Sequence, residues 1–276
     1  MLVNLKEILK YAEDNKCAIG MFNATGLDSI KAIIEAAEEL NTPVILAHAE
    51  VHNIYNDISL IGPIMLDVAK RAKVKVCVHL DHGTSLEMIK KAIEIGFTSI
   101  MIDASSLEFE DNIKLTKKVV SMCHPLNISV EGEIGRIKSL DDTSDNEYYY
   151  TKASEAEIFV KETGVDALAI AFGTQHGFYK EKPELKIDVI KNVKKVVNIP
   201  LVMHGGSGLS EEQFKKCIDA GIRKINYYSY MSKAGYDAAK KVIESNKTNY
   251  MHDVEYASYK VMKDDLLKAI KIFNNK

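Results

Sequence analysis

The chain lacks the features that mark membrane, secreted and nucleic-acid-binding proteins. It has no apolar run of the roughly 18 residues that a transmembrane helix requires, and residues 1–11 lack the apolar core of a signal peptide. Its 36 Lys and Arg residues are balanced by 39 Asp and Glu residues, for a net charge of −3, so no excess of basic residues favours a nucleic-acid partner. We therefore predict a cytoplasmic protein that binds neither membranes nor nucleic acid.

Cysteine is also scarce. The four cysteines, at positions 17, 77, 123 and 217, are far apart in the sequence and form no Cys-x-x-Cys pair. This pattern favours buried, reduced thiols over disulfides or a zinc knuckle. The remaining composition, 46% hydrophobic and 27% charged, is typical of a globular protein, and 276 residues suit either one large barrel or two small domains.

Short apolar runs alternate with amphipathic segments along the whole chain. Runs that are apolar throughout are typical of parallel strands covered on both faces, and apolar residues at i, i+3, i+4 and i+7 indicate helices. The predicted strands are residues 18–22, 44–47, 76–80, 99–102, 128–130, 167–171, 201–203 and 224–225. The predicted helices are residues 29–40, 60–71, 86–95, 113–123, 154–163, 187–197 and 211–220, with a further short amphipathic helix over residues 1–11.

Eight strand–helix units predict an α/β fold of the TIM (β/α)8 barrel type. We expect a single domain over residues 1–276, in which residues 232–276 form a helical C-terminal extension that closes the barrel or packs on a partner subunit. A doubly wound open sheet is the alternative, but its first strand should lead into a glycine-rich nucleotide-binding turn. Residues 22–26, Phe-Asn-Ala-Thr-Gly, do not match one. The polar, acidic segment 138–151 is long enough for a mobile active-site loop.

Reactive residue types cluster directly after the predicted strands. Active sites of such barrels lie at the carboxyl ends of the strands. The candidates are Asn23, His48, Glu50, Asp81, His82, Asp103, Glu131, Glu133, His176, His204 and Asn226. We therefore expect these side chains to meet at one mouth of the barrel.

Three of the histidines, His82, His176 and His204, are each followed by glycine. Any one of them in isolation would be interpreted as a hydrogen-bonded structural histidine. Three imidazoles from the ends of three different strands match catalytic zinc, which takes three protein ligands and leaves a fourth position open. We therefore predict that these three side chains bind Zn²⁺.

The segment Leu-Val-Met-His-Gly-Gly-Ser-Gly-Leu-Ser, residues 201–210, predicts an anion site. Its strand ends in Gly205, Gly206 and Ser207, and a helix begins near Ser210. Unpaired N–H groups and the helix dipole at such a turn attract phosphate. The residues after strand eight, Asn226, Tyr227, Tyr228 and Ser229, add an amide and hydroxyl groups to the same end of the barrel.

A metal with an open position beside a phosphate site indicates a small phosphorylated substrate. Asp81, next to the ligand His82, is placed to move a proton from a substrate hydroxyl. Retro-aldol cleavage, metal-assisted isomerisation and metal-assisted hydrolysis all use this arrangement. The residues alone leave these three reactions open.

Four segments carry a resemblance to a known family. They are HLDHGTSLEMIKKAIEIGFTSIMIDAS, VEGEIGRI, GVDALAIAFGTQHGFYK and IPLVMHGGSGLS. They resemble segments of the class II, zinc-dependent fructose-bisphosphate and tagatose-bisphosphate aldolases. The match runs in the same order along the chain, from about Asn23 to Asn226. The resemblance implies cleavage of a phosphorylated ketose to glycerone phosphate and an aldehyde such as glyceraldehyde 3-phosphate, in a homodimer or homotetramer.

The resemblance also assigns residues. It implies that zinc is held by His82, His176 and His204, that Asp81 serves the C4 hydroxyl of the ketose, and that Asp103 and Glu133 hold a second or displaced divalent ion. The positions expected to contact the sugar phosphate are Asn23, Gly177, Gly205, Gly206, Ser207, Asn226, Tyr227, Tyr228 and Ser229. A monovalent cation, K⁺ or Na⁺, is implied near Gly177, Gly205 and Ser207.

The chain departs from the family pattern around the substrate. Asp141 stands where the family has a loop glutamate that exchanges the C3 proton, and Asp142 is the alternative for this step. Ser229 and Tyr230 stand where the family favours threonine followed by an acid. The substrate is therefore expected to be fructose 1,6-bisphosphate, tagatose 1,6-bisphosphate or a deoxy-sugar-acid phosphate. A non-catalytic sugar-phosphate-binding homologue is the alternative from another functional class.

Overall fold

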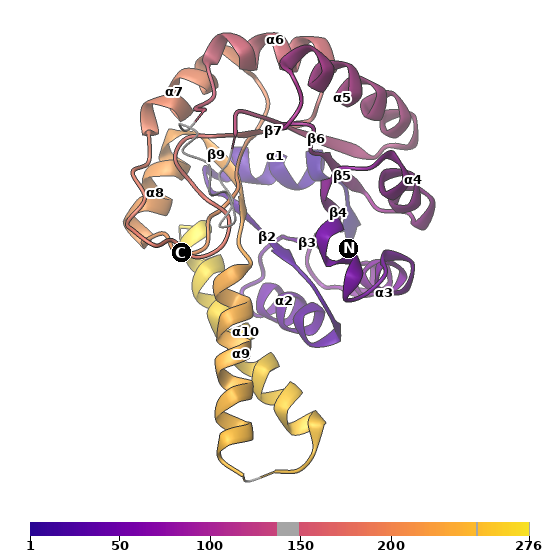
Figure 1. Cartoon of the computed structure of the whole chain (residues 1–276), viewed down its shortest axis with the longest axis vertical. Coiled ribbons are helices and arrows are strands. Elements are labelled where there is room, and N and C mark those ends of the chain that lie inside the picture. The colour runs from indigo at the N-terminus through magenta and orange to yellow at the C-terminus, as the bar shows by residue number, and fades with distance from the viewer. Residues whose placement is uncertain (137–148, 247, 276) are drawn as a thin grey trace.

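Eight parallel strands close into a barrel, and helices cover its outer face (Figure 1). The computed structural model describes residues 1–136, 149–246 and 248–275. The barrel strands are β2 (Ile19–Asn23), β3 (Val44–Ala49), β4 (Val76–Gly83), β5 (Ser99–Ile102), β6 (Ser129–Ile134), β7 (Ala167–Ile170), β8 (Leu201–Met203) and β9 (Ile222–Asn226). Each pairs with the next in the chain, and pairing of β2 with β9 closes the ring. The predicted TIM barrel is confirmed.

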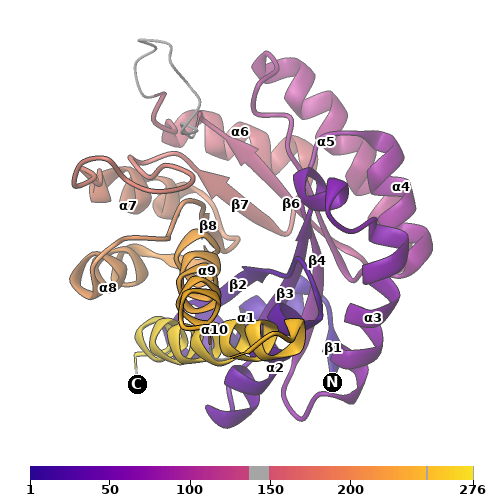
Figure 2. The same cartoon turned by 60° about the horizontal axis from the view of Figure 1, so that its bottom comes forward.

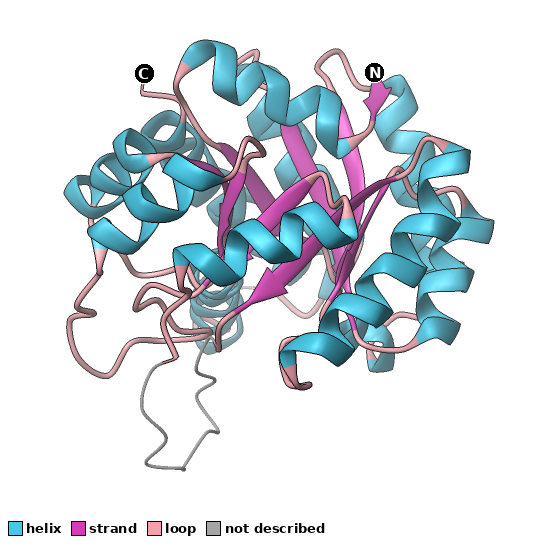
Figure 3. Cartoon of the chain, turned by 90° about the horizontal axis from the view of Figure 1, so that it is seen from above, coloured by secondary structure: helices cyan, strands magenta, loops and turns pink. Residues whose placement is uncertain are grey.

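Within the described residues, seven α-helices connect consecutive strands. They are α2 (Leu27–Glu39), α3 (Ile58–Arg71), α4 (Leu86–Ile95), α5 (Phe109–Cys123), α6 (Ala153–Thr163), α7 (Ile187–Val196) and α8 (Glu211–Ala220). Two short 3-10 turns, η1 (Glu50–Ile54) and η2 (His124–Leu126), follow β3 and α5. Figure 3 shows the strands enclosed by this outer layer of helices.

Local sequence signals set several helix ends. The side chains of Asp57 and Ser85 accept backbone N–H bonds at the starts of α3 and α4, which is the usual function of an N-cap residue. Gly96 and Gly164 end α4 and α6 in the left-handed conformation that favours glycine. Because these signals are short-range, the predicted and observed helix ends agree within a few residues.

The prediction of one helix over residues 1–11 was partly wrong. A two-residue strand, β1 (Leu2–Val3), pairs with the start of β4, and α1 (Leu5–Asn15) begins after it. Asn4 caps this helix by accepting the N–H of Glu7 at 3.0 Å. Because Leu2 and Val3 can add hydrogen bonds to the edge of β4, pairing prevails over helix extension.

Helix α1 lies across the ring of strands (Figure 1) and closes the amino end of the barrel. Its apolar face packs into the barrel interior. The residues of this inner core are Leu5, Ile8, Leu9, Ala12, Cys17, Ile19, Met21, Ile45, Ala47, Cys77, Ala167, Ala169 and Val202. All are buried, so the part of the interior that packs on α1 is largely apolar.

The chain ends in two long helices, α9 (Ser229–Glu244) and α10 (Met251–Phe273), which project from the barrel as a pair (Figures 1 and 2). The predicted C-terminal helices are thus confirmed. Helix α10 packs against α9 and α2, and its last residue returns to the barrel, where the carbonyl of Phe273 accepts the N–H of Ala18 at 2.9 Å. Among the described residues, no helix is both long and apolar enough to cross a membrane. The oligomeric state stays a prediction.

The strands extend further than the apolar runs predicted. Seven residues that were expected after strands lie within them: Asn23 in β2, His48 in β3, Asp81 and His82 in β4, Glu131 and Glu133 in β6, and Asn226 in β9. Those that face the cavity, such as Asp81 and Glu133, do so while their backbones continue the strand pairing. Apolar character alone therefore ended the predicted strands too early.

Phe273 ties the helical extension to the barrel. Its fully buried ring lies 4.9 Å from Phe214, 6.0 Å from Tyr227 and 6.5 Å from Phe22, measured between centroids. We predict that Phe273→Ala lowers the free energy of unfolding by about 3–5 kcal/mol in urea denaturation, because it leaves a cavity among aromatic rings. The control Tyr236→Ala, at a side chain 64% exposed on α9, should change it by less than about 0.5 kcal/mol. Equal effects would show that α10 is not anchored in this way.

Candidate active site

A cavity of about 410 Å³ lies at the carboxyl ends of the barrel strands. Most of its lining was expected from the sequence. These residues are Asn23, Asp81, His82, Asp103, Glu133, His176, Gly177, Gly205, Ser207, Asn226, Tyr227, Tyr228 and Ser229. Ala49, Val51, His52 and Ser105 complete it. His204 is fully buried directly beside His82.

A bulge in β4 places Asp81 and His82 on the same side. Consecutive residues of a regular strand point to opposite faces. Here the pairing of β4 with β5 shifts register between Leu80 and Gly83, and His82 has a left-handed φ of 46°. As a result, both side chains line the cavity, with Nε2 of His82 4.0 Å from Oδ1 of Asp81. Glycine is required at position 83 because a Cβ would lie 2.8 Å from the Met101 carbonyl oxygen.

The other two histidines are brought together by a close approach of two loops. His176 follows β7, and His204 comes directly after β8. Gly205 has a φ of 65°, and a Cβ there would lie 2.2 Å from the carbonyl oxygen of Gln175. Only glycine therefore allows the two backbones to pass so closely. The hydroxyl of Tyr179 donates to the Gly205 carbonyl at 2.7 Å and links the loops.

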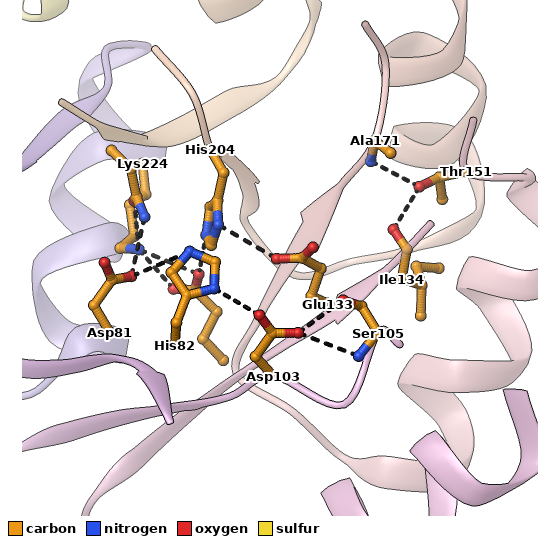
Figure 4. A network of polar contacts seen from close by, with 12 residues as sticks. Asp81, His82, Asp103, Ser105, Glu133, Ile134, Thr151, Ala171, His204 and Lys224 are labelled. Carbon is orange, nitrogen blue, oxygen red and sulfur yellow. Dashed lines mark hydrogen bonds and ion pairs between the residues drawn. The ribbon is translucent and has the colours of Figure 1, made fainter. Parts of the chain in front are cut away.

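The rings of His82, His176 and His204 converge. Their centroids lie 4.6 Å (His82–His204), 5.0 Å (His82–His176) and 5.8 Å (His176–His204) apart, and one ring nitrogen of each lies within 4.8 Å of the other two. Nε2 of His176 is buried with no hydrogen-bond partner among the described residues. Nδ1 of His204 likewise makes no hydrogen bond within the described residues, but it lies 3.3 Å from Oε2 of Glu133. Nδ1 of His82 donates to Asp103 at 2.7 Å (Figure 4), which leaves its Nε2 available.

This arrangement fits a divalent transition metal. Buried ring nitrogens without partners are costly, and a metal ion would satisfy those of His176 and His204 together. Burial, followed by the nearby His82 and His204, lowers the pKa of His176 to about 3, so this ring is held in the neutral form that a metal requires. Three nitrogen donors beside an open cavity are the ligand set of catalytic zinc.

Carboxylates surround the same place and favour a cation. His82, Asp103 and Glu133 form a second group whose ligand atoms lie within 4.8 Å of one another. Burial raises the pKa of Glu133 well above its usual value, and Asp103 raises it further. Burial opposes a charged His82, but Asp81, Asp103 and Glu133 outweigh it and raise the His82 pKa to about 10. A metal would displace the proton on Nε2 of His82 and supply positive charge in its place.

Two amides hold the Asp81 carboxylate in place. Asn23 donates to its Oδ2 at 2.9 Å, and Asn226 donates to its Oδ1 at 3.2 Å. Burial alone would raise the pKa of Asp81, but His82 and other positive groups nearby lower it below its usual value. The carboxylate faces the cavity beside His82 and can therefore accept a proton from a bound molecule.

The structure favours the start of α9 over the start of α8 as the anion site. At α8, the Ser210 side chain already accepts a helix N–H at 3.3 Å, and Glu211 and Glu212 add negative charge to the first turn. Helix α9, all of whose residues are described, has neither a side-chain cap nor an acid in its first turn. Its N-cap residue Tyr228 and its first residue Ser229 line the cavity, so the positive end of the helix dipole lies beside the cavity, where it favours an anion.

Among the described residues, the predicted substrate contact Gly206 does not line this cavity. Gly206 lies behind the wall, where its N–H donates to the Asn226 carbonyl at 3.0 Å. Asp141 lies outside the described residues, as does Asp142, so the assignment of C3 proton exchange stays a prediction.

Sequence reasoning missed His52 and Lys224. His52, in η1, lines the cavity with its ring centroid 4.8 Å from that of Tyr228. Its position shortly after a strand was the available signal. Lys224 is fully buried within β9, and a lysine inside a predicted barrel strand was a signal that needed an explanation.

Comparison with known proteins shows the family. The model of the family "Fructose-bisphosphate aldolase class-II" matches residues 3–276. The chain belongs to this family. Class II aldolases are lyases and are generally zinc-dependent, in agreement with the three converging histidines.

Individual class II aldolases are similar over most of the chain. A fructose-bisphosphate aldolase of Staphylococcus aureus (strain Mu50) is 38% identical over 255 residues, covering 90% of this chain and 88% of the relative. YdjI of Escherichia coli K12 is 36% identical over 277 residues, covering 100% and 98%. The crystal structure of the YdjI aldolase matches with a TM-score of 0.90 over 99% of this chain and 97% of that one.

The histidine cluster makes a direct prediction about metal binding. We expect His176→Ala to weaken Zn²⁺ binding at least about 100-fold, because it removes one of three ligands and not merely a supporting group, whose loss costs 10–100-fold. Competition with a chromogenic chelator measures the affinity. The matched control is His124→Ala, whose half-exposed ring pairs with Asp166 at 3.0 Å away from the cavity. Unchanged affinity in the His176 variant would contradict the ligand assignment.

Proposed function

We propose that the chain is a metal-dependent class II aldolase that reversibly cleaves a phosphorylated ketose to glycerone phosphate and an aldehyde. The observation that carries this proposal is the shared cavity of His82, Asp81 and the start of α9. It combines a site for a divalent ion, an ionised carboxylate 4.0 Å from a ligand histidine, and free helix N–H groups for a phosphate. Membership of the class II family supports aldol chemistry over isomerisation and hydrolysis.

His82, His176 and His204 would hold the catalytic Zn²⁺. A bound zinc ion supplies Lewis-acid polarisation of the substrate oxygens. Asp103 and Glu133, which share a second cluster with His82, would hold a second or displaced divalent ion.

The monovalent cation, K⁺ or Na⁺, is proposed for the turns of Gly177 and Gly205 beside Ser207. These three residues line the same side of the cavity. The Gly205 carbonyl already accepts the Tyr179 hydroxyl at 2.7 Å, and a carbonyl oxygen has a second lone pair for a cation.

Asp81 is assigned the proton transfer. In the cleavage direction, its carboxylate accepts the proton of the C4 hydroxyl as the C3–C4 bond breaks. The C4 oxygen then becomes the aldehyde carbonyl, and the electron pair of the broken bond stays on the glycerone phosphate fragment. In the condensation direction, Asp81 returns the proton to the new hydroxyl. The amides of Asn23 and Asn226 keep the carboxylate oriented during both steps.

The phosphate of the glycerone phosphate fragment is placed at the start of α9. The uncapped first turn of α9, which begins at Ser229, would offer backbone N–H groups and the Ser229 hydroxyl there. The Ser207 hydroxyl accepts the Tyr228 N–H at 3.0 Å and ties the loop after β8 to this site. These residues bind and orient the phosphate, which fixes the distance between the C4 hydroxyl and Asp81.

Fructose 1,6-bisphosphate is the first candidate substrate, because the S. aureus relative carries that name. Tagatose 1,6-bisphosphate and a deoxy-sugar-acid phosphate are the alternatives. The wall formed by Ala49, Val51 and His52 bounds the same cavity and would contact the aldehyde half of the substrate.

Cleavage should depend on a metal and release glycerone phosphate. The test panel consists of fructose 1,6-bisphosphate, tagatose 1,6-bisphosphate and a deoxy-sugar-acid phosphate. We predict that the protein cleaves at least one of them, that a chelator abolishes the activity, and that Zn²⁺ or Co²⁺ restores it. A coupled assay that reduces glycerone phosphate measures the rate. Binding of glycerone phosphate without cleavage of any panel member and without exchange of its C3 proton would instead support the non-catalytic homologue.

Loss of the Asp81 carboxylate should separate metal binding from catalysis. We expect Asp81→Ala to retain Zn²⁺ but to lose at least about 100-fold in rate, which is the usual effect of removing a general acid or base. Metal content is measured by elemental analysis of the dialysed protein. A variant that keeps its metal and cleaves the substrate at a rate near that of wild type would disprove the assignment of Asp81.

A further inference from the structure

A chain of buried polar contacts runs through the barrel interior beneath the metal histidines. Nε2 of His204 donates to Oε1 of Glu131 at 2.9 Å. The Lys224 ammonium lies 2.9 Å from the Glu131 Oε2 atom and donates to Oε1 at 3.2 Å. All three side chains are fully buried, and Figure 4 shows Lys224 beside Asp81 and His204. One buried cation is therefore linked to a predicted metal ligand through a single carboxylate.

The same ammonium also reaches the proton-transfer residue. Lys224 donates to the side-chain oxygen of Asn226 at 2.8 Å, and the amide nitrogen of Asn226 donates to Asp81 at 3.2 Å. Because Lys224 has only donors, it fixes the Asn226 amide with its oxygen toward Lys224 and its NH₂ group toward Asp81. With the opposite orientation, the amide oxygen would face the carboxylate.

The strand geometry places these groups on one face. Lys224 and Asn226 are two residues apart on β9, and Glu131 and Glu133 are two apart on β6, so each pair points into the barrel. Ala167 is the registered neighbour of Glu131 on β7, and its small side chain leaves room for the ion pair.

We propose that Lys224 is a positioning residue that fixes the orientation of His204 for metal binding and that of Asn226 for holding Asp81. Lys224 holds the Glu131 carboxylate at 2.9 Å, and Glu131 accepts Nε2–H of His204 at 2.9 Å, so the ring is oriented with Nδ1 facing the metal site. The predicted effect on kcat rests on the proposed aldolase function, whereas the predicted effect on metal binding can be measured without it.

Metal binding tests the His204 branch, by which we mean the contacts from Lys224 through Glu131 to His204. We expect Lys224→Met to weaken Co²⁺ binding about 10–100-fold, as for other groups that support a ligand, and to alter the visible absorption spectrum of the bound ion. The control Lys194→Met removes a partly buried lysine whose partner, Glu13, lies 2.7 Å away on α1. It should leave both the affinity and the spectrum unchanged.

A second variant keeps the test decisive if Lys224→Met does not fold. Lys224→Met/Glu131→Leu replaces the pair by apolar side chains and leaves no uncompensated charge, a change that buried ion pairs often tolerate. It removes the acceptor of His204, so we expect the same weakening of Co²⁺ binding. An affinity within twofold of wild type, together with an unchanged spectrum, in a folded variant of either kind would overturn the His204 branch.

Kinetics test the second branch, which is the set of contacts from Lys224 through Asn226 to Asp81. At saturating Co²⁺ we expect Lys224→Met to lower kcat at least about 10-fold, and to have little further effect in an Asn226→Ala background, because both changes act through one contact. Multiplicative losses would overturn this branch. If the wild-type protein cleaves no ketose phosphate, the proposed function fails while the Co²⁺ titration still decides the role of Lys224.

Discussion

The carboxyl half of the barrel depends on a balance of buried charge. Asp81, Glu131 and Glu133 lie within it, and each is less than 5% exposed. Isolated buried carboxylates are strongly unfavourable, so each must have a partner. Lys224 compensates Glu131, whereas the other carboxylates surround His82 at the place where a divalent cation fits. A bound metal ion would thus balance the remaining negative charge of these carboxylates. Its positive charge would also polarise the substrate during catalysis.

This polar half rests on an apolar one. Helix α1 plugs the amino end with Leu5, Ile8 and Leu9, and these pack on inward-facing strand residues such as Met21. A second, larger core lies between the strands and the outer helices. Stability therefore comes mainly from regions that do not touch the cavity.

The sequence was sufficient to predict the barrel because each strand–helix unit carries its own apolar period and its own caps. It was also sufficient to predict that His82, His176 and His204 lie close together, because the barrel places the carboxyl ends of all its strands at one mouth. The strand ends were predicted too early, because polar residues such as Asp81 and Glu133 point into the barrel while the backbone pairing continues.

Other features depend on geometry that local patterns do not encode. The bulge that places Asp81 and His82 on one side is visible only in the shifted pairing of β4 with β5. The uncapped start of α9 is a candidate anion site only because Tyr228 and Ser229 line the cavity. Lys224 had a sequence signal, since polar residues two apart recur in β4, β6 and β9, but its partners became known only from the fold.

The central claim is that three imidazoles meet at one divalent ion, and anomalous diffraction from crystals of the zinc-loaded protein tests it most directly. The account predicts one strong peak at about 2.0–2.1 Å from Nε2 of His82, Nε2 of His176 and Nδ1 of His204. A peak held by carboxylates alone, or His204 bound to zinc through Nε2 in place of Nδ1, would contradict it.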